Sequence, residues 1–90
     1  MAELIRTASA GSEDSGDVQV TVSPAQELRL QITSTLYAQF GTAIERTARQ
    51  VLAERKIAAG EIRIADKGAL DWILRARLEA ALMQAEEAAV

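Results

Sequence analysis

The stretch DVQVTVSPAQELRLQITS (residues 17–34) decides the fold, because apolar and polar residues alternate in it along two runs. The apolar positions are Val18, Val20, Val22, Leu28, Leu30 and Ile32. A period of two is typical of strands that bury one face and leave the other in water. Pro24 ends the first strand, since proline cannot donate a hydrogen bond to a ladder. We therefore expect two strands that the short segment 23–26 joins into an antiparallel hairpin.

The rest of the chain predicts a helix, a third strand and a last helix. Ser34 or Thr35 can cap the first helix, and Asp66 can cap the last one. The expected bounds are about 56 for the end of the first helix, 62–64 for the strand and 67–85 for the last helix. The apolar side of the first helix contains Leu36, Phe40, Ala43, Ile44, Thr47 and Val51, and that of the last contains Leu70, Ile73, Leu74, Leu78 and Ala81.

This order of elements, strand–strand–helix–strand–helix, predicts a small two-layer α+β domain with about three strands packed on two helices. Residues 1–16 are poor in large apolar side chains, so we expect most of them to form a mobile N-terminal arm. Residues 17–85 are the single α+β domain, and residues 86–90 form a short acidic, alanine-rich tail.

Composition excludes several classes of function. Ninety residues make one domain with a modest core, in which aromatic residues are only 3%. The formal charge of −3 argues against nucleic-acid binding, and no apolar run is long enough for a membrane span. The chain has no cysteine and no histidine, so we expect no metal site of the usual kind and no Ser–His–Asp triad. The lack of cysteine fits a cytoplasmic protein.

Ser15 stands in EDSGDVQVTV (residues 13–22), between two acidic residues and a glycine. A catalytic serine needs a base, and the sequence brings neither lysine, Lys56 or Lys67, beside Ser15. A modified serine needs exposure and a backbone that fits another enzyme's cleft, which Gly16 favours because it lacks a β-carbon. Asp17 keeps the stretch solvated and offers a charge to a partner enzyme. Ser15 is thus a candidate for covalent modification; the alternative is an ordinary loop serine before a strand.

Two features of the last helix are also candidates for binding. Arg77 falls within its apolar stripe, either as a boundary residue whose head reaches solvent or as a fork that binds a carboxylate or phosphate. Trp72, Ala76 and Met83 form a second apolar line, which predicts a docking surface for a partner protein. The alternative is that Trp72 folds over the helix and covers Ala69 or Ala76.

Three segments of the chain resemble the acyl carrier protein, or γ subunit, of citrate lyase: AGSEDSGDVQVTVSP (10–24), LQITSTLYAQFGTAI (30–44) and DKGALDWILRARLEAAL (66–82). The resemblance covers nearly the whole chain in the same order, and the third segment is its most specific part. It implies that Ser15 carries 2′-(5″-phosphoribosyl)-3′-dephospho-CoA through a phosphodiester, and that a separate holo-enzyme synthase attaches this arm.

The resemblance also implies a non-catalytic carrier that works with two partner subunits. The transferase (alpha) subunit exchanges acetyl for citryl on the arm's thiol, and the lyase (beta) subunit cleaves citryl to acetyl and oxaloacetate. Two alternatives stay open. One is the carrier subunit of citramalate lyase or malonate decarboxylase, and the other is an unmodified protein-binding module that uses the Trp72 face.

Overall fold

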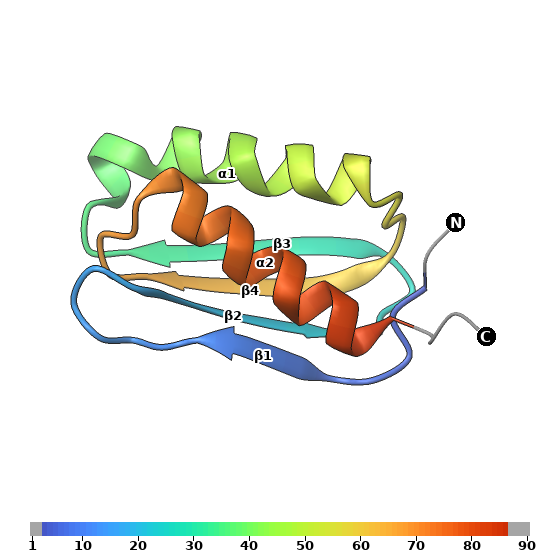
Figure 1. Ribbon diagram of the computed structural model, residues 1–90. Coiled ribbons are helices and arrows are strands. Elements are labelled where there is room, and N and C mark those ends of the chain that lie inside the picture. The colour runs from blue at the N-terminus through green and yellow to red at the C-terminus, as the bar shows by residue number, and fades with distance from the viewer. Residues whose placement is uncertain (1–2, 87–90) are drawn as a thin grey trace.

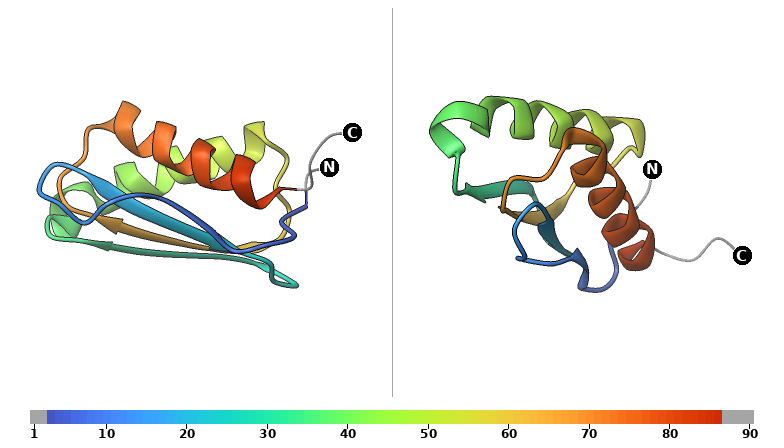
Figure 2. Two further views of the ribbon diagram at one scale, coloured as in Figure 1. Left: turned by 60° about the horizontal axis from the view of Figure 1, so that its bottom comes forward. Right: turned by 60° about the vertical axis from the view of Figure 1, so that its left-hand side comes forward.

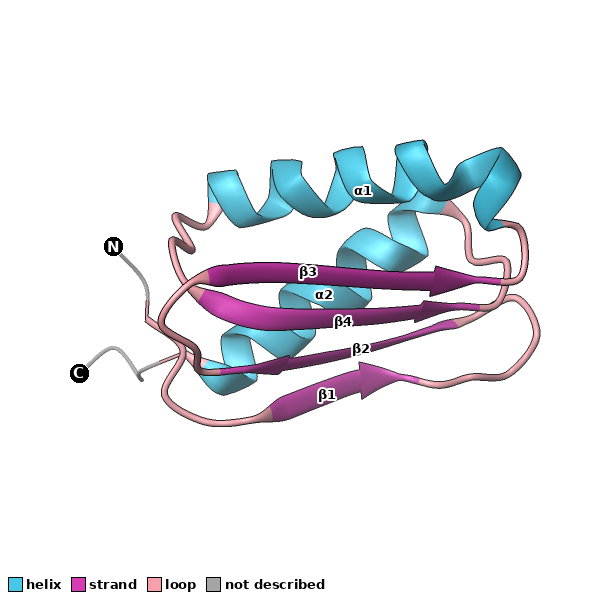
Figure 3. Cartoon of the chain, turned by 180° about the vertical axis from the view of Figure 1, so that it is seen from behind, coloured by secondary structure: helices cyan, strands magenta, loops and turns pink. Residues whose placement is uncertain are grey.

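Four strands and two helices make up the chain in the computed structural model, which describes residues 3–86. The elements are β1 (Ala8–Gly11), β2 (Val18–Ser23), β3 (Leu28–Ser34), α1 (Tyr37–Glu54), β4 (Gly60–Asp66) and α2 (Asp71–Ala85). Both helices cover one face of the sheet and leave the other open (Figures 1 and 3). The predicted two-layer α+β class is confirmed, with one strand more than expected. Neither helix within residues 3–86 is long and apolar enough to cross a membrane.

The strands lie in the order β1-β2-β4-β3, with β3 and β4 parallel and the other pairs antiparallel. The predicted hairpin within residues 17–34 is therefore wrong, because β4 lies between β2 and β3. Burial explains the order. Ile62 and Ile64 of β4 are 0% and 2% exposed, so this strand is covered best at the centre of the sheet. On β3 the side chain of Leu28 remains 36% exposed, as suits an edge strand, and α1 supplies the long crossover that a parallel pair needs.

The core lies between the sheet and the helices. α1 runs along β3, and α2 crosses the sheet on the side of β1 and β2 (Figures 1 and 2). The buried side chains of the helices are Ile44, Thr47, Ala48, Val51, Leu52, Leu74, Leu78, Ala81, Leu82 and Ala85. The first turn of α1 does not reach this core. Leu36 and Phe40, which we expected to pack inside, are 45% and 48% exposed, and Ala43 is exposed as well.

The expectation of a mobile arm does not hold for the segment that forms β1. Residues 8–11 pair with β2, from Ala8 opposite Val22 to Gly11 opposite Gln19. Leu4 is 7% exposed and belongs to the core. The side chains of β1 are too small for hydrophobic alternation to reveal a strand, yet its backbone satisfies the edge of β2. Residues 1–2 of the predicted arm and 87–90 of the predicted tail lie outside the described residues.

Candidate functional site

Ser15 stands at the corner of a tight turn in residues 12–17, the serine loop, which joins β1 to β2. The backbone N–H of Asp17 donates to the carbonyl of Asp14 at 2.9 Å, and Gly16 has a φ of +84°. This combination defines a type II turn with Ser15 and Gly16 at its centre. A β-carbon at Gly16 would meet nothing within 4 Å, so the position needs glycine for its φ and not for space.

The two serines of the loop differ in what their hydroxyls do. The Ser12 hydroxyl donates to Oδ2 of Asp17 at 2.8 Å and accepts from the backbone N–H of Asp14 at 3.2 Å. Ser15 is exposed, and no group within residues 3–86 forms a hydrogen bond with its hydroxyl. Ser12 therefore stabilises the loop, while the hydroxyl of Ser15 is available to an outside reagent.

Backbone contacts hold the serine loop at both ends. The Gly16 N–H donates to the carbonyl of Lys67 at 2.7 Å, and the Lys67 N–H donates to the carbonyl of Asp17 at 2.9 Å. At the other end the Ser12 N–H donates to the carbonyl of Val18 at 3.2 Å, and this carbonyl lies so close to Gly11 that a β-carbon there would be 1.9 Å from its oxygen. The sequence offered no reason to bring Lys67 to this loop, and the hydrogen bonds that it makes there are backbone bonds.

Arg77 pairs with Asp17 and so ties α2 to the serine loop. Its Nε donates to Oδ1 of Asp17 at 3.2 Å and its Nη2 donates to Oδ2 at 3.3 Å. Of the two interpretations of Arg77, the fork that binds a carboxylate describes this contact, and the carboxylate belongs to the chain itself. Binding of an arm phosphate by Arg77 stays a prediction.

Hydrogen bonds lower the pKa of the Asp17 carboxyl from 3.8 to about 2, first from the Val18 N–H, then from the Ser12 hydroxyl and Arg77. Because the pKa of the folded state lies below that of the unfolded state, ionised Asp17 stabilises the fold above about pH 4, and this contribution is lost as the pH falls towards 2. We expect Arg77→Gln to raise this pKa only part of the way to 3.8, since two hydrogen bonds remain. Carboxyl NMR titration of both proteins measures the change; equal values would contradict the role given to the ion pair.

Asp66, only 4% exposed, organises the neighbouring β4–α2 loop. Its Oδ2 accepts from the Ser34 hydroxyl at 2.8 Å and from the Gly68 N–H at 3.2 Å, and its Oδ1 accepts from the Ala69 N–H at 3.0 Å. The prediction that Asp66 caps a helix starting at residue 67 is wrong, because its bonds close a turn and α2 begins only at Asp71. Asp66 thus connects the end of β3 to the β4–α2 loop, in which the carbonyl of Lys67 accepts from the Gly16 N–H.

An apolar groove of about 290 Å³ opens between the start of α1 and the start of α2. Its lining residues are Leu36, Phe40, Ala43, Ile44, Asp66, Gly68, Ala69, Leu70, Asp71 and Leu74. Ile44 and Leu74 are buried and form its floor, whereas Leu70 at its rim is 61% exposed. Leu36, Phe40 and Leu70 were predicted as core residues. Helical periodicity places them on the apolar side of each helix, but it cannot show whether another element covers that side.

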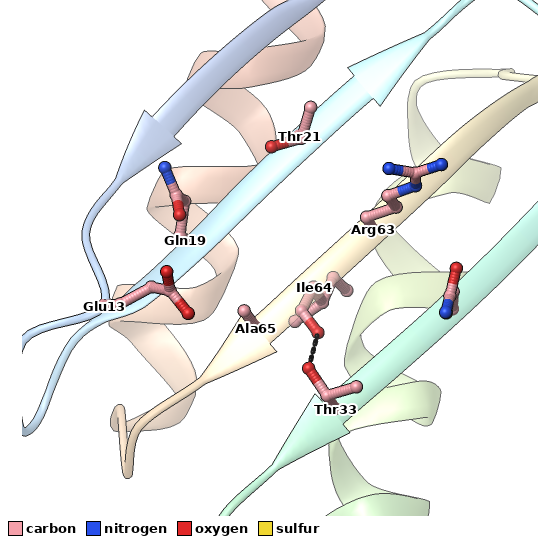
Figure 4. Close-up of a pocket in the computed structure, with 8 residues that line it drawn as sticks. Glu13, Gln19, Thr21, Thr33, Arg63, Ile64 and Ala65 are labelled. Carbon is pink, nitrogen blue, oxygen red and sulfur yellow. Dashed lines mark hydrogen bonds between the residues drawn. The ribbon is translucent and has the colours of Figure 1, made fainter.

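A second, polar hollow of about 460 Å³ lies on the open face of the sheet (Figure 4). Polar and charged side chains from β2, β3, β4 and the serine loop line it: Glu13, Gln19, Thr21, Gln31, Thr33 and Arg63. The strand residues among them are the polar positions of the alternating pattern, so the sequence predicted that this face of the sheet is exposed to water. It could not show that β4 would bring Arg63 between Thr21 and Gln31.

Trp72, Ala76 and Met83 lie on the outer side of α2, as predicted. Trp72 is 68% exposed and Met83 is 64% exposed, so Trp72 does not fold over the helix into a covered position. The exposure of this apolar line is confirmed, and its use as a docking surface stays a prediction.

Comparisons with known proteins agree on one family. Residues 5–85 match the family model described as ACP, malonate decarboxylase delta subunit (MdcD). The citrate lyase acyl carrier protein of Haemophilus influenzae Rd is 44% identical over 98% of this chain and 93% of its own length. That of Escherichia fergusonii is 45% identical over 94% of this chain and 90% of its own length, and that of Serratia proteamaculans is 47% identical over 92% and 83%.

Among solved structures, a chain of a Pseudomonas malonate decarboxylase hetero-tetramer in complex with malonate has the same fold, with a TM-score of 0.77. It is 23% identical and matches over 91% of this chain and 90% of its own length. Taken with a turn that presents a free serine hydroxyl on a small α+β domain, these matches assign the chain: it belongs to the acyl carrier protein family of citrate lyase and malonate decarboxylase.

Proposed function

We propose that this chain is the acyl carrier subunit of citrate lyase, serving the cleavage of citrate to acetate and oxaloacetate. The observation that carries the proposal is that Ser15 is exposed at the corner of a turn held by backbone hydrogen bonds, and that its hydroxyl has no hydrogen-bond partner within residues 3–86. Support for citrate lyase comes from the relatives of that name at 44–47% identity.

The residues of the serine loop fit a covalent prosthetic group, proposed as 2′-(5″-phosphoribosyl)-3′-dephospho-CoA on the Ser15 oxygen. Gly16 keeps the turn open, since no atom lies within 4 Å of where its side chain would start. Asp17 and Arg77 hold the loop in place below the attachment point. When bound, the group supplies a thiol that carries acetyl and citryl as thioesters.

The proposed role of this chain is presentation and not catalysis. With no histidine and no cysteine it has few groups that act as a base or nucleophile near neutral pH. A holo-enzyme synthase would attach the group to Ser15, and the transferase (alpha) and lyase (beta) subunits would perform the reactions. We propose further that these partners dock on Trp72, Ala76 and Met83, and that the complex is cytoplasmic.

A carrier of malonate decarboxylase is the second candidate, favoured by the description of the family model, and a carrier of citramalate lyase stays open beside it. The unmodified binding module is the third, favoured by the exposure of Trp72. The subunits that purify with the native chain separate the first two candidates, because substrate specificity lies in them.

The test of the proposal is mass mapping. Co-expression with the arm-transferring enzyme should add the mass of one prosthetic group to the chain, and the peptide that contains Ser15 should carry it. Chain expressed without that enzyme is the control and should have the mass of the sequence alone. A group on any other peptide, or none in protein purified with its native partners, would contradict the proposal.

A further inference from the structure

The starts of α1 and α2, whose residues line the apolar groove, lie at the same end of the molecule as the serine loop, with the β4–α2 loop between them (Figure 1). The Gly16 N–H donates to the carbonyl of Lys67, and Lys67 stands between two residues that line the groove, Asp66 and Gly68. The chain at Ser15 is therefore linked to the rim of the groove through a hydrogen bond and one residue.

We propose that the apolar groove binds the pantetheine segment of the arm on Ser15, an inference that rests on the proposed function. Pantetheine is a chain of methylene and methyl groups interrupted by amides. The side chains of Leu36, Phe40 and Leu70 offer it apolar walls that are 45%, 48% and 61% exposed in the bare protein. Covering such surface stabilises the bound state by about 25 cal/mol per Å².

One polar group of the groove, the Asp71 carboxylate, suits an amide N–H of pantetheine. The Thr47 hydroxyl donates to Oδ1 of Asp71, which joins α1 to α2 beside the groove and holds its walls together. No other bond within residues 3–86 engages the Asp71 side chain, so Oδ2 is an acceptor for an amide N–H of the arm. The groove has a volume of about 290 Å³, which is at the small end of the range for ligand pockets and suits a narrow, linear segment.

Charge selects the segment that enters. The charged residues in the lining are Asp66 and Asp71, and the described lining contains no lysine or arginine. Carboxylates repel phosphates, so the nucleotide part of the arm stays outside and the uncharged pantetheine is the part that fits. Because the arm is tethered, its local concentration is of order mM, and even a weak site is occupied.

The experiment compares apo and loaded protein by NMR. Isotope-labelled apo-protein is loaded in vitro with unlabelled precursor, and its intact mass verifies one group on Ser15 before any spectrum is recorded. We expect shifts of the backbone amides of Phe40, Ala69 and Leu70 on loading, and filtered NOEs from the methyl groups of the arm to the Leu70 side chain.

Two variants show whether the groove causes these signals. Leu70→Ser should bring the shifts at Phe40 and Ala69 back towards their apo values. Ile5→Ser, at an apolar position that is 47% exposed and lies outside both the groove and the proposed docking surface, should leave them unchanged. Loaded protein whose shifts are confined to residues 12–17, or shifts at Phe40 that survive in Leu70→Ser, would overturn the inference. A chain that cannot be loaded at Ser15 would instead contradict the proposed function.

Discussion

Replacing Ser15 by alanine should abolish loading by the arm-transferring enzyme and change the free energy of unfolding by less than about 0.5 kcal/mol. Loading is lost because the hydroxyl is the proposed site of the phosphodiester. Stability is kept because the side chain is exposed and makes no hydrogen bond with residues 3–86. Intact mass and urea unfolding of the variant measure the two quantities.

Ser12→Ala is the matched control, since it removes the same group from the same loop. Its hydroxyl stabilises the loop through Asp17 and Asp14, so this variant should lose about 1–2 kcal/mol of stability and still accept the prosthetic group. Loading of Ser15→Ala, or a complete loss of loading in Ser12→Ala with Ser15 intact, would show that the attachment site is misassigned.

The largest loss of stability that we expect follows Asp66→Ala, at about 3–4 kcal/mol. The variant removes a carboxylate that accepts three hydrogen bonds, from the Ser34 hydroxyl and from the N–H groups of Gly68 and Ala69. Asp66 itself is only 4% exposed. A domain of this size has a total stability of about 5–15 kcal/mol, so the melting temperature should fall by more than about 10 °C. Hydrogen exchange of the Gly16 amide should also accelerate, since its acceptor Lys67 directly follows Asp66.

Two controls separate the hydrogen bonds of Asp66 from its charge. Asp66→Asn keeps one carbonyl acceptor and should lose about half as much stability as Asp66→Ala. Asp14→Ala removes an exposed carboxylate near the same end of the molecule and should change the free energy of unfolding by less than about 0.5 kcal/mol. Urea unfolding curves with equal slopes provide the comparison, and similar losses for Asp66→Ala and Asp14→Ala would contradict the structural role of Asp66.

Local patterns predicted the two-layer class and the positions of three strands and two helices. Val18, Val20 and Val22 are fully buried, as their alternation requires. The pairing of strands could not be predicted in the same way, because alternation shows which face of a strand is buried and not which strand lies beside it. The predicted hairpin failed for this reason, and β1 was missed because Ala8–Gly11 has no large side chains.

The candidate site also contains local features that the sequence could predict and long-range contacts that it could not. Ser15 and Gly16 were identified as candidates from their neighbours and from the family resemblance, but they were expected in a mobile arm, and the type II turn that presents Ser15 was not predicted. For Arg77 the sequence left two interpretations open, a boundary residue or a fork for an anion, and it could not name Asp17 as the partner, because Asp17 is 60 residues away in the sequence. The apolar groove was not predicted, because Leu36 and Leu70 come to line the same groove only through the packing of α1 against α2.

By itself, then, the sequence determined three of the four strands, the two helices, most of their buried faces, the exposed serine and the family resemblance. All of these follow from periodicity, from the conformations that single residues allow, and from runs of residues along the chain. Only the tertiary structure decided the strand order, the Asp17–Arg77 pair and the groove beside the serine loop. Each of these depends on contacts between segments that are distant in the sequence. Such contacts form where burial and hydrogen bonding are best satisfied for the whole chain, so they cannot be recognised in any single stretch of the sequence.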